Sequence, residues 1–116
     1  MDFEKLNQKH DKAMELAALA LLARQRGDEK KAKPLFREAY DLEREVANEL
    51  VPTDLEPSRS VIHRSAATLA IDCGEYREAE KLAMIGLLGN APASIAAELR
   101  ELLKQVFSQL QQAAGD

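Results

Sequence analysis

The chain has 116 residues, the size of one small domain, and its composition favours helices, because aromatic residues make up only 4% of it and tryptophan is absent. Its 20 acidic and 16 basic residues give a net charge of −4 with no basic arm, which argues against a nucleic acid partner. We expect a cytoplasmic protein outside the membrane, because Cys73 has no second cysteine to pair with, the acidic N-terminus lacks signal-peptide features, and the most apolar run, residues 17–23, is too short to span a bilayer.

Apolar spacing predicts two helices in the first half of the chain. Apolar residues recur every three or four positions from Phe3 to about residue 26, and Gly27 can adopt the left-handed conformation that ends a helix. Asp28 is a suitable cap for a second helix that extends to about residue 50. Pro34 lacks an N–H, so it predicts either a kink in this helix or a start later than Asp28. We therefore predict a helical hairpin at about residues 3–50.

A second hairpin is predicted at about residues 57–89, after a loop at residues 51–57. Pro57 suits the first turn of its first helix, and Gly74 ends that helix. A final helix at about residues 92–113 has the clearest apolar spacing, and we expect the tail from residue 111 onward to fray. The predicted fold is all-α: a single domain, 1–116, of five antiparallel helices, in which two hairpins are followed by a C-terminal capping helix.

The two glycine turns belong to a duplicated segment, because alignment of the turns also aligns acidic and small residues around them. The aligned pairs are Gly27 with Gly74, Asp28 with Glu75, Ala32 with Ala79, and Ala39 with Gly86. Small residues at such positions allow two helices to approach to about 8 Å. Any antiparallel helical bundle could use glycine turns and alanine contacts in this way, so a generic bundle remains an alternative.

A hairpin with a Gly-acid turn, small contact residues and an aromatic residue in its second helix resembles the tetratricopeptide repeat. The resemblance covers about residues 13–44 and 60–92. The sequence departs from the family pattern at three positions of the second unit: Ala83 replaces the aromatic residue, Gly86 replaces an alanine, and His63 replaces a large apolar residue. The two units are also offset by 47 residues, from Gly27 to Gly74, instead of 34. The resemblance implies a non-enzymatic interaction module that binds a peptide or helix of a partner protein.

The resemblance places the partner-binding surface on the first helix of each hairpin. The residues that it implies are Leu21, Arg24 and Gln25 from the first hairpin, and Arg64, Thr68 and Asp72 from the second. The last three are four residues apart and share one helix face. Two arginines beside one aspartate predict a groove that favours an acidic peptide. The clamp that some family members use for a chaperone's C-terminal carboxylate is absent, because Ala17, Ala18 and Leu21 occupy several of its positions.

Few residues suit an active site. With two histidines and one cysteine, the chain has no spaced cluster for zinc, and it has no glycine-rich phosphate loop, so we predict neither a metal nor a cofactor. Arg59 and His63 lie one helical turn apart and could form a nuclease-like pair. The simpler interpretation is a polar helix start, with His63 half-buried against the neighbouring hairpin. A third possibility is a self-assembling subunit, a homodimer whose interface is the first or the last helix.

Overall fold

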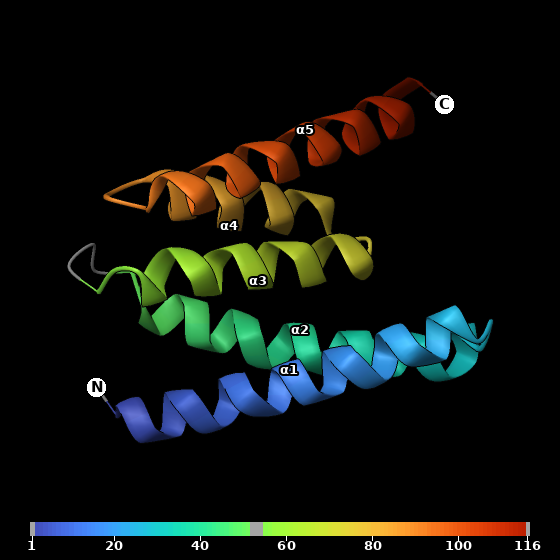
Figure 1. The fold of residues 1–116 in the computed structure, drawn as a ribbon. Helices are drawn as coiled ribbons and strands as arrows, with labels where there is room; N and C mark the ends of the chain where they lie inside the picture. Colours follow the sequence, from blue (N-terminus) through green and yellow to red (C-terminus); the bar gives the residue numbers. More distant parts are fainter. Residues whose placement is uncertain (1, 52–54, 116) are drawn as a thin grey trace.

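The described part of the chain folds into five α-helices joined by turns. The computed structural model describes residues 2–51 and 55–115. The helices are α1 (Phe3–Gln25), α2 (Glu29–Glu49), α3 (Ser58–Asp72), α4 (Tyr76–Leu87) and α5 (Ala93–Gly115). Successive helices run in opposite directions along the molecule (Figure 1). The prediction of an all-α fold with five helices is confirmed, whereas residues 52–54 of the predicted loop lie outside the described residues.

The turn between α1 and α2 forms as predicted. Gly27 has a φ of +79°, the left-handed conformation that a glycine adopts without strain. The side chain of Asp28 accepts a hydrogen bond from the backbone N–H of Lys31 at 3.2 Å, and it thereby caps α2. Because α2 begins directly after this cap, the alternative of a later start is wrong, and Pro34 lies inside the helix.

The turn between α3 and α4 repeats this geometry. Gly74 has a φ of +75°, and the predicted left-handed residue is confirmed. The backbone N–H of Asp28 donates to the Ala23 carbonyl at 2.9 Å, and the equivalent N–H of Glu75 donates to the Ala70 carbonyl at 2.8 Å. Both bonds satisfy a carbonyl that the end of the preceding helix leaves without a partner. The duplicated sequence therefore produces a duplicated turn.

Two helix boundaries differ from those predicted. Pro57 immediately precedes α3, which begins at Ser58, so the proline occupies the cap position instead of the first turn. The segment that we expected to fray is helical, because α5 continues to Gly115. The first part of α5 packs on α4 and also contacts α3, whereas its C-terminal part extends beyond the N-terminal end of α4 (Figure 1).

Small residues fill the helix contacts, as the duplicated pattern predicted. Ala32, Ala39 and Ala79 are fully buried. At Gly86 a Cβ atom would lie 3.1 Å from the Cβ of His63 on α3 and 3.1 Å from both methyl carbons of Leu99 on α5, so only glycine fits there without movement of its neighbours. Three helices therefore meet closely at Gly86. None of the helices in residues 2–51 and 55–115 combines the length and the hydropathy needed to cross a membrane.

Candidate functional site

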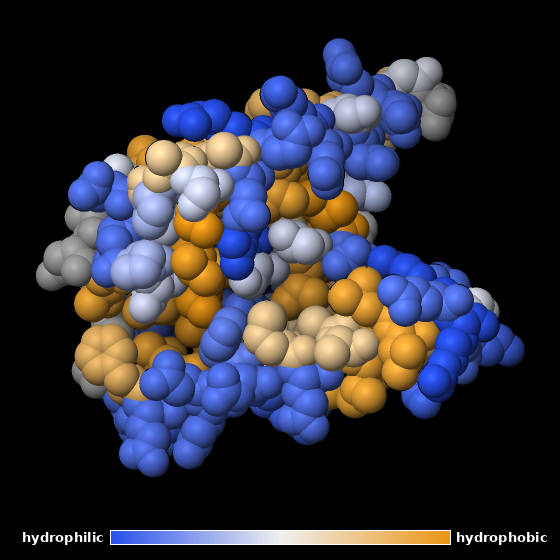
Figure 2. Space-filling model, in the orientation of Figure 1, coloured by the Kyte–Doolittle hydropathy of each residue, from blue (hydrophilic) through white to orange (hydrophobic). Residues whose placement is uncertain are grey.

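A pocket opens between the N-terminal ends of α1 and α3. Its volume is about 400 Å³, within the range of roughly 300–1,000 Å³ that is usual for ligand sites. The lining residues are Phe3, Leu6, Asn7, His10, Val46, Leu50, Leu55, Glu56, Ser58, Val61 and Ile62. Most of them are apolar. Figure 2 shows apolar atoms at the surface between α1, in the lower part of the view, and the helices above it.

One polar pair is built into the wall of this pocket. The Nδ1 atom of His10 on α1 lies 3.0 and 2.9 Å from the two carboxylate oxygens of Glu43 on α2. Glu43 is 0% exposed. Burial raises the pKa of its carboxyl group, and the contact with His10 opposes that rise. Glu43 thus holds the imidazole ring of His10 through Nδ1, and His10 is among the residues that line the pocket.

The sequence analysis did not select His10 or Glu43. The two residues are 33 positions apart and lie on different helices, so no local spacing connects them. A signal for His10 was nevertheless present. His10 lies seven residues after Phe3 and seven before Ala17, so all three share the face of α1 on which the groove was expected. Extension of that face toward the N-terminus would have identified the pocket wall.

At the opposite end of α1 and α3, the predicted residues Arg24 and Asp72 form an ion pair. Nη1 of Arg24 donates to Oδ1 of Asp72 at 3.1 Å, and Nε of Arg24 donates to Glu29 at 3.3 Å. The guanidinium also lies over the ring of Phe36, with Cζ 4.2 Å from its centroid. Burial raises the pKa of Asp72, and Arg24 opposes the rise. The structure therefore brings these two predicted residues together.

The other predicted residues are distributed differently. Arg64 donates to Glu98 of α5 at 2.6 Å, and the hydroxyl of Thr68 donates to the main-chain carbonyl of Arg64 at 2.9 Å. Leu21 and Gln25 are exposed on α1. The prediction of a basic groove included Asp72 as the one acidic residue near the two arginines. In the structure Arg24 pairs with both Asp72 and Glu29, and Arg64 pairs with Glu98, so three carboxylates lie beside two arginines. These side chains give no net positive charge.

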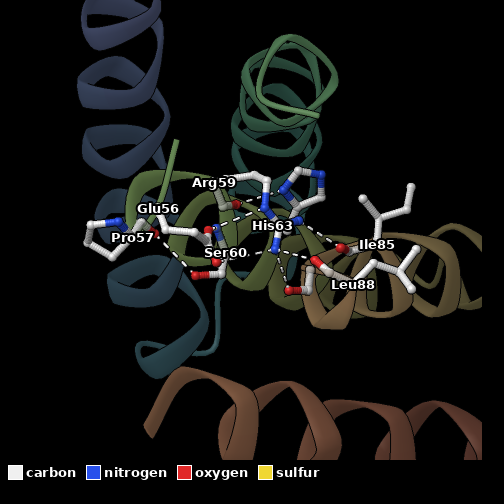
Figure 3. Close-up of polar contacts among 8 residues, drawn as sticks. Glu56, Pro57, Arg59, Ser60, His63, Ile85 and Leu88 are labelled. Carbon is white, nitrogen blue, oxygen red and sulfur yellow. Dashed lines mark hydrogen bonds and ion pairs between the residues drawn. The ribbon is translucent and has the colours of Figure 1, made fainter. Parts of the chain in front are cut away.

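Arg59 and His63 lie together, as their spacing predicts (Figure 3), but both are buried. Each is 1% exposed. The prediction of a half-buried His63 is wrong, because the residue is fully buried, and its Cβ lies against Gly86 of α4. Its Nδ1 lies 2.7 Å from the main-chain carbonyl of Arg59, and burial lowers the pKa of the ring. A substrate would have no access to this pair without movement of the helices around it.

The guanidinium of Arg59 instead satisfies the end of α4. Nη1 donates to the carbonyl of Ile85 at 2.7 Å, and Nη2 donates to the carbonyls of Gly86 and Leu88 at 2.9 and 2.6 Å. Nε lies 3.2 Å from a carboxylate oxygen of Glu56. The last carbonyls of a helix have no partner within the helix, and a guanidinium offers five donors. Arg59 is therefore a buried cap that ties α3 to α4.

Within residues 2–51 and 55–115, no three side chains of His, Cys, Asp or Glu form a group that could hold a metal ion. Cys73 is a half-buried free thiol whose pKa is raised by burial. Comparisons with protein-family models, curated proteins and solved structures found no match to this chain.

Proposed function

We propose that this protein is a non-enzymatic interaction module that binds an extended or helical segment of a partner protein in the groove between α1 and α3. The observation that carries this proposal is the pocket of about 400 Å³ between the N-terminal ends of these helices. Both helices pack on α2, and the buried side chains of Val46 in α2 and of Leu50, which directly follows α2, line the pocket. An open hollow in which most lining residues are apolar and a few are polar is typical of a recognition site.

In this proposal the bound segment runs along α1 from the pocket beside Phe3 to the contact of Arg24 with Asp72 of α3. The 21-residue step from Phe3 to Arg24 corresponds to roughly 30 Å along a helix. An extended peptide of about nine residues covers the same distance. A short linear segment of a partner is therefore the occupant that we expect.

A tetratricopeptide-like design is part of the proposal. Two turns with the same left-handed glycine and the same closing hydrogen bond support it, as do the buried alanines of both hairpins. The packing of α5 on α4 and α3 suits a capping helix, which repeat proteins need at their ends. We also propose a cytoplasmic location, because a chain whose sole cysteine is a free thiol suits a reducing compartment.

Two phenylalanines of similar exposure provide a test. Phe3 lines the pocket and is 54% exposed, whereas Phe107 is 50% exposed on α5, away from the pocket lining. We would purify proteins that bind the wild-type chain from its own cells, identify them by mass spectrometry, and repeat the experiment with Phe3→Ser and Phe107→Ser. The proposal requires that Phe3→Ser loses a partner that Phe107→Ser keeps, with both variants helical by circular dichroism. Equal retention by both variants would move the binding surface elsewhere.

Self-association through α1 is a second candidate function. Leu19, Leu21 and Leu22 are 46%, 48% and 42% exposed, an unusual concentration of exposed leucine on one helix. Analytical ultracentrifugation over a range of concentrations tests this candidate. A dimer that the double variant Leu21→Ser/Leu22→Ser converts to a monomer would support it, and a wild-type chain that stays monomeric would reject it.

A further inference from the structure

One wall of the pocket is bonded to the arginine that caps α4. This wall is the segment that leads into α3, and three of its residues line the pocket: Leu55, Glu56 and Ser58. The backbone N–H of Arg59 donates to the carbonyl of Leu55 at 2.9 Å. Nε of Arg59 lies 3.2 Å from Oε1 of Glu56. Both the backbone and the side chain of Arg59 are therefore held by residues of the pocket wall.

The carboxylate of Glu56 is fixed at both of its oxygens. Oε1 accepts from the backbone N–H of Ser60 at 3.0 Å, and Oε2 accepts from Nη2 of Arg59 at 3.4 Å. The side chain of Glu56 is 15% exposed and that of Arg59 is 1% exposed. Removal of one partner from a buried ionic contact costs far more than the loss of a surface ion pair. The guanidinium and the carboxylate therefore tend to move together.

The other side of the guanidinium holds the last turn of α4. The carbonyl of Ile85 accepts from Nη1 of Arg59 at 2.7 Å, and it also accepts from the backbone N–H of Leu88 at 3.1 Å. Figure 3 shows Glu56 on one side of Arg59, and Ile85 and Leu88 on the other. None of the described residues that line the pocket belongs to α4. Arg59 thus bonds to the pocket wall and to a helix end that lies outside the pocket.

The last turn of a helix can open locally, at a free energy well below that of global unfolding. Opening of this turn in α4 would separate the carbonyl of Ile85 from Arg59 and allow the guanidinium to move together with Glu56. A ligand that packs on the pocket wall restrains Glu56 and so opposes that movement. Opening then costs more while the pocket is filled. By linkage, the closed turn must favour binding to the same degree.

We propose that Glu56 and Arg59 couple the pocket to the end of α4: a segment bound in the pocket stabilises the last turn of α4, and the closed turn strengthens binding of the segment. This inference rests on the proposed function and adds a means of regulation to the same site. Any contact or substitution that opens the turn between α4 and α5 weakens binding in the pocket, although it lies outside the pocket.

Hydrogen exchange measured by nuclear magnetic resonance tests the coupling. N-acetyl-leucine methylamide is the probe, because it represents one apolar residue within a peptide chain, and backbone signals of the pocket residues report its binding. At a probe concentration that saturates these signals, exchange of the Leu88 amide should slow roughly fivefold, the lower end of typical coupling between sites. The Asp28 amide, which donates to the Ala23 carbonyl at the opposite end of α1, is the control for general stabilisation and should slow less.

Glu56→Gln tests the route of the coupling. The glutamine retains an oxygen that can accept from the backbone N–H of Ser60, but it removes the charge that pairs with Arg59. With the pocket again saturated, this variant should lose most of the slowing at Leu88. Glu98→Gln is the matched control, because it also removes the carboxylate partner of an arginine of α3, the exposed pair with Arg64. The control variant should keep the slowing.

The outcomes separate this inference from the proposed function. If the probe shifts the pocket signals but slows Leu88 no more than Asp28, or slows Leu88 equally in Glu56→Gln, the coupling is overturned and the groove remains as the binding surface. If the probe shifts no pocket signal, both the coupling and the support for the groove are lost. Should Glu56→Gln fail to fold, the comparison of Leu88 with Asp28 in the wild type still decides.

Discussion

The guanidinium of Arg24 on α1 donates to the carboxylate of Asp72 on α3 at 3.1 Å, and it thereby joins the first helices of the two hairpins. The same two helices border an open pocket at their other ends. The two ends of the surface between α1 and α3 therefore differ: one end has an ion pair and the other has a pocket. The contact also makes a prediction about stability.

Arg24→Met should destabilise the domain by about 0.5–1 kcal/mol at neutral pH, since the pair is partly exposed. The variant leaves the half-buried carboxylate of Asp72 without Arg24, so its pKa should rise further. A raised carboxyl pKa penalises the folded state above that pKa, and the penalty disappears as the pH falls through it. The loss measured by urea denaturation should therefore shrink on acidification, and Arg24→Met/Asp72→Asn should recover part of it. A loss independent of pH would contradict this account.

Arg59→Met should cost far more than Arg64→Met, although both substitutions remove an arginine from α3. The guanidinium of Arg59 is buried and bonds three carbonyls at the end of α4, all of which would lose that donor. Loss of one partner from a buried ionic network typically costs about 3–5 kcal/mol. Arg64 makes an exposed pair with Glu98, worth about 0–1 kcal/mol. Similar melting temperatures for the two variants would show that Arg59 is not a cap.

Gly86→Ala should lower the free energy of unfolding by about 1–2 kcal/mol, because overpacking typically costs about 1–3 kcal/mol and the helical preference of alanine returns a part of it. The added methyl group would press on His63 and Leu99 at 3.1 Å. Gly115→Ala is the matched control, since a Cβ there meets nothing within 4 Å. The measurement is chemical denaturation of both variants. If Gly86→Ala left the free energy of unfolding unchanged, α4 and α5 would be able to separate slightly at no cost.

His63 should make the domain less stable in mild acid. Burial lowers the pKa of the folded ring below its ordinary value of 6.5, so the unfolded chain takes up a proton before the folded chain does. Its contribution to stability is complete above pH 6.5 and decreases as the pH falls toward the folded pKa, with a slope of at most about 1.4 kcal/mol per pH unit. Other groups in the chain also respond to pH, so the measured quantity is the difference in stability between the wild type and His63→Gln between pH 7.5 and 5.5. Parallel pH profiles would refute this role.

The helices and their turns could be predicted because their signals are local. A repeat of three or four residues and a glycine before an acid specify a helix and its end without reference to the rest of the chain. The end of α5 was predicted too early, although Gln and Ala in its last turns are good helix formers.

The burial of polar residues could not be predicted from local patterns. Arg59 and Glu43 are charged, and a charge in a helical pattern is normally assigned to the solvent face. Each is buried because another helix supplies what it needs: the end of α4 supplies carbonyls to Arg59, and α1 supplies His10 to Glu43. The prediction for Arg24 and Asp72 succeeded in placing them together, but it omitted Glu29 and Glu98, which lie on other helices.

The hydrogen bonds of Arg59 constrain the length of α4. The donors of this side chain meet carbonyls of Ile85, Gly86 and Leu88, which belong to the point at which the helix stops. One residue inserted into α4 would rotate those carbonyls by about 100° and translate them by about 1.5 Å, out of reach of a side chain that cannot follow them. Insertions and deletions should therefore be tolerated less well in residues 76–87 than in the turn that follows Leu88.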